Sequence, residues 1–173
     1  ITKKMNLPPF NIFPTLSTEK IMLREILISD IPDIVEISFY NAKQAENLEQ
    51  AIEMQERINQ DYRNGNSIHW GISHRTTNKI MGTCGYYRGL ETGTGELGCV
   101  LLPMFRGQGI MTNAMKLAID FGLYKIELNR IMAITNKQNQ SAIKLLDRLN
   151  FIKVDDLLNE EVKYEFKSQL KSK

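Results

Sequence analysis

Apolar residues recur at helical spacing early in the chain and predict two helices there. Residues 21–26 read as a first strand ahead of them. Ser29 or Asp30 can cap the first helix, and Pro32 suits its first turn. The apolar side of this helix follows at helical spacing as Ile31, Ile34, Val35 and Ile37. The second helix is longer, spans residues 44–64, and has an inner side marked by Leu48, Ile52, Gln55, Ile58 and Tyr62.

Beyond residue 66 the spacing changes to alternation, which predicts strands. Ile68, Trp70 and Ile72 alternate within residues 67–74, and further strand-like runs follow at residues 79–87 and 96–102. We expect these three strands to form an antiparallel meander.

Helical and strand patterns then alternate along the rest of the chain. A helix is predicted at residues 110–124, a strand at 130–135, a helix at 141–149, and strands at 151–156 and 162–167. This order predicts an α+β domain with a mixed, mostly antiparallel sheet flanked by helices. The strand–helix–strand unit from Glu96 to Thr135 should be a right-handed crossover with its two strands parallel.

The length and the charge of the chain limit the number of domains and the kinds of protein that it can be. A chain of 173 residues suffices for one domain with a core, so residues 17–173 read as a single domain and the proline-punctuated residues 1–16 as an extended arm. With 22 Lys and Arg against 20 Asp and Glu, the chain lacks the concentrated basic face of a dedicated nucleic-acid or membrane binder. No apolar run approaches the roughly 18 residues of a membrane span. Residues 1–16 lack the unbroken apolar core of a signal peptide, so the predicted location is cytoplasmic.

The cysteines and histidines predict neither a metal site nor a disulfide framework. Cys84 and Cys99 lie in apolar stretches and read as small buried side chains. His69 and His74 lie in one strand on opposite sides, and no third metal ligand accompanies them. Trp70 reads as a core residue rather than a substrate platform.

The stretch from Arg106 to Gly109 is the strongest candidate for ligand binding. Its glycines let backbone N–H groups point inward, and the predicted helix start adds unpaired donors with a partial positive charge. Arg106 adds a fixed cation, so the turn suits an anion such as phosphate. A plain glycine turn is the alternative. No Gly-Lys-Ser/Thr follows as in a Walker loop, and Thr112 replaces the third glycine of the dinucleotide fingerprint.

Residues 106–111 (RGQGIM) resemble the R/Q-x-x-G-x-G/A pyrophosphate loop of the GNAT-superfamily N-acetyltransferases. The preceding GELGCVLLP is similar to that family's fourth strand, and TNKQNQSAIKLLDRLNF to its N-x-x-(S/A) helix with the Gly-Phe that follows. The order of elements also matches, over residues 21–166. Within the superfamily, GELG and GQGIMTNAM most resemble the ribosomal-protein N-terminal acetyltransferases (RimJ/RimL-like). The resemblance implies a GNAT-like sheet whose β-α-β crossover carries the CoA loop.

The resemblance further implies an acyltransferase that moves the acetyl group of acetyl-CoA to a primary amine by direct attack, without a metal. The amine would belong to a protein N-terminus, a peptide or a small molecule. Acetyl-CoA binding falls on the preceding strand, the loop, the helix start and one asparagine: Val100, Leu101, Leu102, Arg106, Gly107, Gln108, Gly109, Ile110, Met111 and Asn139. A backbone N–H around residues 100–102 would bind the thioester carbonyl. Asn139 can instead make only an Asx turn.

Four positions depart from the family pattern. Met111 stands where the family has a final Gly or Ala, and Asn150 where it has the Gly before Phe. Asn tolerates the left-handed conformation, so that turn can survive. The family's helix serine falls on Ala142, with Ser141 one place early, and the tyrosine that many members use as general acid falls on Leu146.

Glu96 is the candidate base, because the family often places a carboxylate at the start of this strand that acts directly or through water. A solvated glutamate at a strand end is the alternative. Ser141 is the remaining candidate for the general acid, although it can simply cap its helix. Tyr87 is a looser alternative for that role.

Other functions stay open at this point. The departures at Leu146 and Ser141 also suit a catalytically weak acyl-CoA-binding sensor or interaction domain, and the loop alone would suit a nucleotide-phosphate binder. The acceptor site is expected around residues 41–64 and 86–94. Many family members form homodimers, and no feature of this sequence decides between monomer and homodimer. An acidic acceptor pocket, which would favour polyamines or aminoglycosides, is suggested by four glutamates, although their spacing is that of one solvated helix face: Glu46, Glu49, Glu53 and Glu56.

Overall fold

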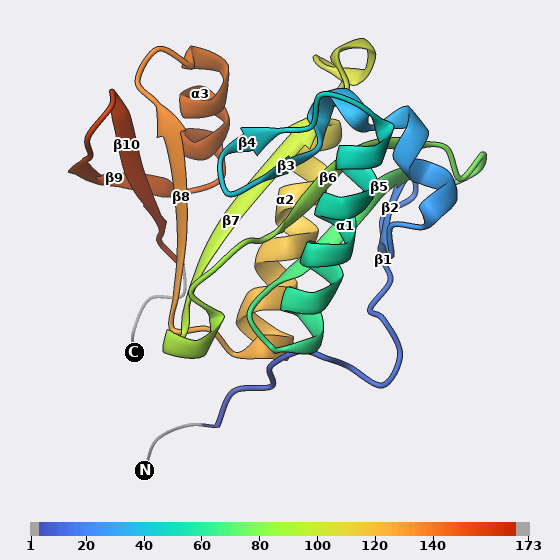
Figure 1. The fold of residues 1–173 in the computed structure, drawn as a ribbon. Coiled ribbons are helices and arrows are strands. Elements are labelled where there is room, and N and C mark those ends of the chain that lie inside the picture. Colours follow the sequence, from blue (N-terminus) through green and yellow to red (C-terminus); the bar gives the residue numbers. More distant parts are fainter. Residues whose placement is uncertain (1–3, 169–173) are drawn as a thin grey trace.

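The computed structural model describes residues 4–168, so the outermost residues of the predicted arm (1–3) and of the predicted domain (169–173) lie outside the described part. Its main sheet has eight strands in the order β1-β2-β5-β6-β7-β8-β10-β9, and β3 and β4 form a separate hairpin (Figure 1). The strands of the main sheet are β1 Leu16–Ser17, β2 Ile21–Arg24, β5 Ile68–His74, β6 Ile80–Tyr86, β7 Thr94–Leu101, β8 Arg130–Asn136, β9 Phe151–Asp156 and β10 Glu161–Phe166. The hairpin strands are β3 Phe39–Tyr40 and β4 Lys43–Gln44.

Every strand pair of the main sheet is antiparallel except β7 and β8. The meander β5-β6-β7 and the parallel strands of the crossover are therefore confirmed. The β7–β8 pairing is short, and its last pair is Glu96 with Met132. Beyond that point the two strands diverge, so the remaining part of β7 keeps one edge that β8 does not cover (Figure 1).

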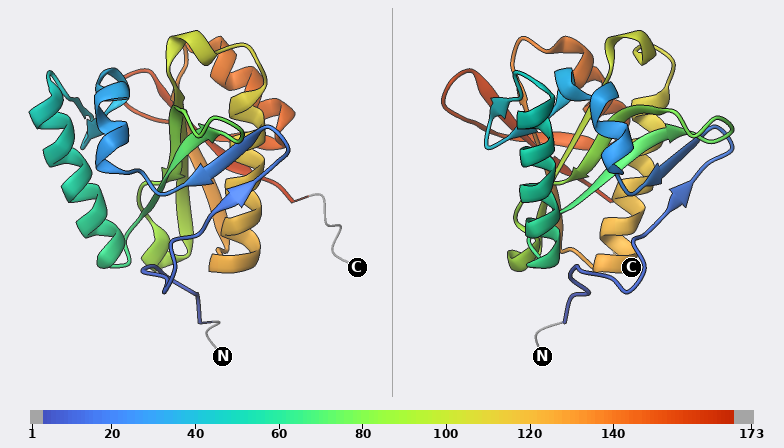
Figure 2. Two further views of the ribbon diagram at one scale, coloured as in Figure 1. Left: turned by 90° about the vertical axis from the view of Figure 1, so that its right-hand side faces the viewer. Right: turned by 45° about the vertical axis from the view of Figure 1, so that its right-hand side comes forward.

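The helices α1 (Leu48–Arg63) and α2 (Ile110–Phe121) lie on opposite faces of the sheet, and α3 (Gln140–Arg148) packs beside β9 (Figure 2). The alternation in β5 explains the main core, because Ile68, Trp70 and Ile72 point to the α2 side and are fully buried. The Trp70 indole N–H donates to the Pro14 carbonyl at 3.0 Å, so its prediction as a core residue is confirmed.

The prediction of a first α-helix is wrong. Its residues form two 3-10 turns, Ile28–Asp33 and Val35–Ile37. Pro32 lies inside the first turn. It has no N–H for an α-helical hydrogen bond, and in an α-helix its ring would clash with the carbonyl four residues earlier. The Asp30 carboxylate also accepts hydrogen bonds from the Leu27 N–H at 2.8 Å and from both terminal nitrogens of Arg24 at 2.7 and 2.9 Å. These bonds fix a tight local turn in place of a regular helix.

Two helix boundaries differ from their predictions. Helix α1 begins at Leu48 rather than at residue 44, because the β3–β4 hairpin uses the preceding residues and the Asn47 side chain caps α1 by accepting from the Gln50 N–H at 2.9 Å. Leu48 itself is exposed rather than on the inner side. Helix α2 ends at Phe121 and continues into a π-helical turn, Gly122–Ile126.

The described part of the N-terminal arm packs against the domain. The Phe10 N–H donates to the Tyr62 hydroxyl at 3.0 Å, and the Phe10 ring meets the Phe121 ring edge-on at 5.6 Å between centroids. The Asn6 N–H donates to the Ile126 carbonyl at 3.2 Å. The arm therefore closes the core where α1 and α2 end.

Cys84 and Cys99 face each other directly across β6 and β7 as free thiols. A hydrogen bond with the Cys84 thiol, followed by burial, raises the pKa of Cys99 well above its usual value. Cys99 therefore stays protonated near neutral pH, which is poor for a nucleophile. Within residues 4–168 no group of three or more His, Cys, Asp and Glu side chains could hold a metal ion. None of the helices in that range is long and apolar enough to cross a membrane.

Candidate active site

The loop before α2 has the backbone of an anion site. Gly107 and Gly109 are left-handed, with φ of +76° and +77°, and Gly109 is the N-cap of α2. A β-carbon at either position would meet no atom within 4 Å, so this side of the loop is open. The first turn of α2 has no side-chain cap and no acidic residue. Its N–H groups and partial positive charge are thus available to a diphosphate.

The side chains of the loop mostly serve its own structure. Gln108 donates to the Met104 carbonyl at 3.2 Å, Ile110 is buried in the core, and Met111 packs partly against that core. Arg106 is exposed, with a terminal nitrogen 3.4 Å from the Leu101 carbonyl oxygen. An anion at this loop would therefore meet backbone N–H groups and the Arg106 guanidinium.

The uncovered edge of β7 offers backbone groups from alternate residues. The Leu102 N–H donates to the Met81 carbonyl at 2.9 Å, and Val100 pairs with Thr83, so the backbone groups of Val100 and Leu102 point to β6. Antiparallel alternation then turns the N–H and C=O groups of Cys99 and Leu101, which lie beyond the last β7–β8 pair, to the edge that β8 leaves. Of residues 100–102, which we expected to supply an N–H to the thioester, only Leu101 presents one on this edge. Sequence reasoning missed Cys99, although the alternation itself could have indicated it.

A cavity of about 580 Å³ lies on the α1 side of the sheet. Apolar side chains from the 3-10 turns and α1 line it, among them Ile34, Ile37, Met54 and Ile58. His69, Thr83, Tyr87 and Val100 line it from the sheet, and the turn of the β3–β4 hairpin contributes Asn41 and Ala42. The cavity therefore lies between the two segments, around residues 41–64 and 86–94, that the sequence indicated for the acceptor.

Glu96 lies where β7 and β8 begin to diverge, because it forms the last β7–β8 pair. Alternation along β7 turns its side chain to the same face as Val100, which lines the cavity. The Glu96 side chain is 17% exposed, and its Oε2 contacts the Arg88 guanidinium without a well-aligned hydrogen bond. Arg88 also lines the cavity, so this ion pair connects Glu96 to it.

Two aromatic side chains, Tyr87 and His69, lie next to each other in the cavity lining. The ring of Tyr87 covers Gly98, and its centroid lies 4.6 Å from the His69 ring centroid. Burial is the main cause that raises the pKa of Tyr87 well above its usual value, so its hydroxyl stays protonated at neutral pH. Burial lowers the pKa of His69 to about 4, which leaves that ring uncharged. Tyr87 is therefore a neutral proton donor close to Glu96.

The residues predicted from the family's helix lie elsewhere. Ser141 is the second residue of α3, is exposed, and does not line the cavity. The Asn139 side chain caps α3 by accepting from the Ala142 N–H at 3.1 Å, which is the Asx-type role. Leu146 is buried in the core, and Asn150 is left-handed with φ of +66°, as its substitution for glycine required. The structure thus brings Glu96 close to Tyr87 and leaves Ser141 outside the cavity.

The acidic side of α1 does not contribute to the cavity. Three of the four glutamates belong to the helix and Glu46 precedes it. All four are exposed, and none of them lines the cavity: Glu46, Glu49, Glu53 and Glu56. Their interpretation as a solvated helix face agrees with this placement.

An open strand edge, a helix start without a cap and a glycine loop between them suit a ligand that carries a phosphate group and an extended arm able to pair with a strand. An acetyltransferase (GNAT) domain matches residues 20–152, which is most of the chain. The chain therefore belongs to the GNAT family of acetyltransferases. It is an acetyltransferase, and acetyl-CoA is its acetyl donor.

Curated relatives agree with this assignment. The chain is 27% identical over 150 residues to the uncharacterized N-acetyltransferase YoaA of Bacillus subtilis (strain 168), covering 82% of this chain and 85% of that protein. It is 30% identical over 149 residues to the uncharacterized N-acetyltransferase p20 of Bacillus licheniformis, covering 80% and 83%. A shorter match, 32% over 65 residues, is to the spermidine N(1)-acetyltransferase of Escherichia coli (strain K12), covering 38% and 35%.

Solved structures share the fold at low identity. The ribosomal-protein-S5-alanine acetyltransferase from Vibrio fischeri superposes with a TM-score of 0.74 at 19% identity, covering 92% of this chain and 100% of that chain. The microcin C7 self-immunity acetyltransferase MccE, solved with acetyl-CoA and AMP, gives 0.71 at 18%, covering 86% and 92%. A variant of the spermidine N-acetyltransferase SpeG from Vibrio cholerae gives 0.70 at 15%, covering 83% and 93%. The predicted fold, a mixed and mostly antiparallel GNAT sheet flanked by helices, is confirmed.

Proposed function

We propose that this enzyme acetylates a primary amine, of a protein N-terminus, a peptide or a small molecule, by direct attack on acetyl-CoA with Glu96 as the base. The observation that carries the proposal is the position of Glu96, at the divergence of β7 and β8 and on the cavity face of β7. Glu96 accepts the proton of the attacking amine as the N–C bond forms. The C–S bond breaks, and the leaving thiolate takes a proton from a general acid.

Each predicted cofactor residue except Asn139, which caps α3, has a place in this proposal. The backbone N–H groups of residues 107–111 and the Arg106 guanidinium hold the diphosphate. The open edge of Leu101 and Cys99 pairs with the amides of the pantetheine arm, and one of these N–H groups binds the thioester oxygen. Val100 forms the cavity wall beside the thioester, and Leu102 anchors the strand through its bond to Met81.

We assign the general acid to Tyr87, with Ser141 as the second candidate. Tyr87 lines the cavity, and its ring packs against Gly98 on the same face of β7 as Glu96; these two features support it. Tyr87→Phe should then lower kcat about 100-fold, a typical share for proton transfer, while Ser141→Ala leaves kcat within about threefold. The reverse pattern would transfer the role to Ser141.

The variant Glu96→Gln tests the base directly. We expect kcat to fall at least about 100-fold while acetyl-CoA still stabilises the fold. A hundredfold excess of acetyl-CoA over its dissociation constant should add about 2.7 kcal/mol in a thermal shift for wild type and variant alike. Glu91→Gln, on the exposed 3-10 turn between β6 and β7, is the matched control and should keep wild-type activity.

The alternatives predict different outcomes of the same experiment. Binding of acetyl-CoA without turnover of any amine in a broad panel would indicate a sensor or interaction domain. Stabilisation by ATP and not by CoA would indicate a nucleotide-phosphate binder.

We also propose membership of the RimJ/RimL-like branch and a cytoplasmic location. The structural likeness to the ribosomal-protein-S5-alanine acetyltransferase supports the branch, while the spermidine acetyltransferase match competes with it. Acetylation of a ribosomal-protein N-terminal peptide in preference to other peptides would support the branch, and indifference to peptides would contradict it.

A further inference from the structure

The side chains around the cavity define a class of acceptor. We infer that the cavity takes an amine with a single ammonium group attached to an uncharged, largely apolar body, and that it discriminates against polyamines. This inference rests on the proposed amine acetylation and specifies its substrate. It follows from the charges, the walls and the cover of the cavity.

Only two lining side chains of the described cavity are ionised, and one of them, a carboxylate, is free to bind a ligand cation. Among the described lining residues, Asp61 and Arg88 are the ionised ones, because His69 is uncharged. Arg88 is already paired with Glu96. Asp61 therefore remains as the lining carboxylate without a cation in ion-pair contact, and it complements the ammonium form of the attacking nitrogen itself, before that nitrogen gives its proton to Glu96.

Asp61 is held in place by a neutral partner. The Tyr40 hydroxyl donates to Asp61 Oδ2 at 2.9 Å, which leaves Oδ1 to accept from a ligand. Arg57 lies over the Tyr40 ring, 5.7 Å from its centroid, and is not part of the cavity lining. The carboxylate is thus oriented by a hydrogen bond rather than neutralised by a salt bridge.

The walls of the cavity suit an apolar body beside that ammonium. Ile34 and Ile37 from the 3-10 turns face Met54 and Ile58 from α1. Their side chains leave a volume of about 580 Å³, in the range of small-molecule sites. Contact with apolar groups here stabilises a ligand by about 25 cal/mol per Å² removed from water.

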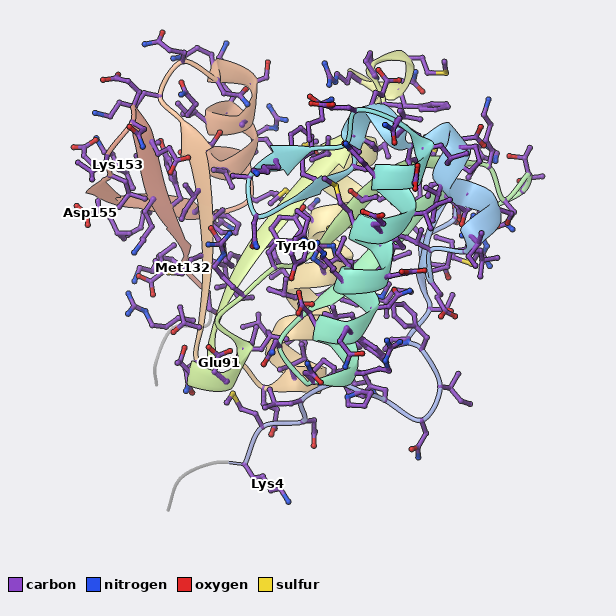
Figure 3. The ribbon with its side chains drawn as sticks, in the orientation of Figure 1. Lys4, Tyr40, Glu91, Met132, Lys153 and Asp155 are labelled. Atoms are coloured by element: carbon purple, nitrogen blue, oxygen red, sulfur yellow. The ribbon has the colours of Figure 1, made fainter. Side chains whose placement is uncertain are left out.

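The β3–β4 hairpin adds aromatic groups to the same space. Tyr40 lies between β7 and α1 (Figure 3), and Phe39 of the same hairpin also lines the cavity. The turn that carries them is tight, because Asn41 and Ala42 are left-handed, with φ of +48° and +63°. Aromatic faces attract an ammonium or pack against an apolar body, so Phe39 and Tyr40 suit both parts of such a monoamine.

A polyamine would leave cations without partners in this cavity. Each further ammonium would be desolvated among apolar walls, which costs several kcal/mol when no carboxylate is present. Glu46 and the three glutamates of α1 do not offset this cost, because they are exposed and do not line the cavity. The cavity therefore separates monoamines from polyamines by charge.

The test is a panel of amine acceptors, each incubated with the full chain and acetyl-CoA. Turnover is measured as release of the CoA thiol, and the product is identified by its mass. The panel contains phenylethylamine, a tripeptide with a free N-terminal Phe, the same peptide with N-terminal Asp, and spermidine. We expect kcat/KM for phenylethylamine or the Phe peptide to exceed that for spermidine by at least a hundredfold. The phenylethylamine and peptide arms distinguish a small amine from a protein N-terminus as the natural source. Equal or better use of spermidine would overturn the inference.

A pair of variants on α1 tests the charge argument independently. Ile58→Glu adds a carboxylate inside the cavity one helical turn from Asp61, whereas Gln60→Glu adds one on the exposed side of α1. We expect Ile58→Glu to raise the ratio of spermidine to phenylethylamine turnover at least tenfold, and Gln60→Glu to leave it unchanged. An unchanged ratio in Ile58→Glu, with acetyl-CoA binding intact, would contradict the inference.

Asp61→Asn should raise KM for the preferred monoamine about tenfold, the effect of one lost charge-assisted hydrogen bond, without changing acetyl-CoA binding. An unchanged KM would contradict the role of Asp61. Failure of this inference is distinguishable from failure of the proposed function. Acetylation of spermidine in preference to monoamines leaves the transferase intact and removes only this inference, whereas no turnover of any amine removes both.

Discussion

The ring of Tyr87 fills the space that a side chain at Gly98, on the neighbouring strand, would occupy. A β-carbon at position 98 would lie 2.7 Å from Cζ of Tyr87, far inside contact distance. The missing side chain at position 98 is therefore what lets Tyr87 lie flat on β7, next to His69 and beside the proposed base Glu96.

Gly98→Ala should displace the Tyr87 ring from the site. Forcing a methyl group into this contact should cost about 2 kcal/mol of unfolding free energy. A misplaced donor should lower kcat/KM about 100-fold while acetyl-CoA binding persists. Denaturant unfolding and steady-state kinetics measure the two effects.

The double variant Gly98→Ala with Tyr87→Ala tests whether the loss of stability in Gly98→Ala comes from a clash between the new methyl group and the Tyr87 ring. Once the ring is absent, the added methyl group has no partner to strike, so the unfolding free energy should recover by most of the lost amount relative to additivity. Additive losses would show that Gly98 matters for another reason.

Substitutions at Gly109 and at Met111 should affect acetyl-CoA binding differently. Gly109→Ala introduces a β-carbon where φ is +77°, which costs about 1 kcal/mol, and that carbon projects into the open space expected for the diphosphate. We expect acetyl-CoA binding to weaken about tenfold, equal to about 1.4 kcal/mol. Isothermal titration calorimetry measures the affinity.

Met111→Ala is the matched comparison. The Met111 side chain packs partly against the core, so its loss should cost about 1–2 kcal/mol of stability, less than for a fully buried residue. Its backbone N–H is unchanged, and acetyl-CoA affinity should stay within about twofold. A large loss of affinity in Met111→Ala would mean that the side chain itself meets the donor.

Asn139 allows its two suggested roles to be separated. Asn139→Asp keeps an oxygen that accepts from the Ala142 N–H but removes the amide donors, whereas Asn139→Ala removes the cap and should cost about 1 kcal/mol. If the residue only caps α3, Asn139→Asp should bind acetyl-CoA as wild type does. Weaker binding in Asn139→Asp with unchanged stability would assign the amide to the donor. Calorimetric affinity and thermal unfolding together decide the case.

The order of elements could be predicted because burial imposes a period on each of them. The alternation of Ile68, Trp70 and Ile72 needs only one buried face, and the structure buries all three against α2. The segment around Asp30 could not be predicted in this way. Its apolar spacing suits a helix, and the outcome depends on a bond between Arg24 and Asp30 that joins different elements.

The candidate site could be predicted only where it is local in sequence. The loop at Gly107 and Gly109 is contiguous, and its glycines adopt the backbone that the motif requires. The cavity draws on α1, the hairpin, the 3-10 turns and three strands, so no short stretch encodes it. The link between Tyr40 and Asp61 spans two elements whose packing no periodicity reveals.

The buried ion pair of Asp30 with Arg24 should make stability depend on acid. Burial alone would raise the pKa of Asp30, but the hydrogen bonds from Arg24 and from the Leu27 N–H outweigh it and hold the pKa below the usual 3.8. Because the folded pKa is the lower one, the pair contributes fully above about pH 4 and its contribution is lost as the pH falls through the folded value. Asp30→Asn should lower the unfolding free energy by about 2 kcal/mol at pH 7. In this acid range the unfolding free energy of the variant should depend less steeply on pH than that of the wild type. Asp33→Asn, exposed on the same turn, should match wild type in urea unfolding at each pH, and equal acid sensitivity of Asp30→Asn and wild type would refute the assignment.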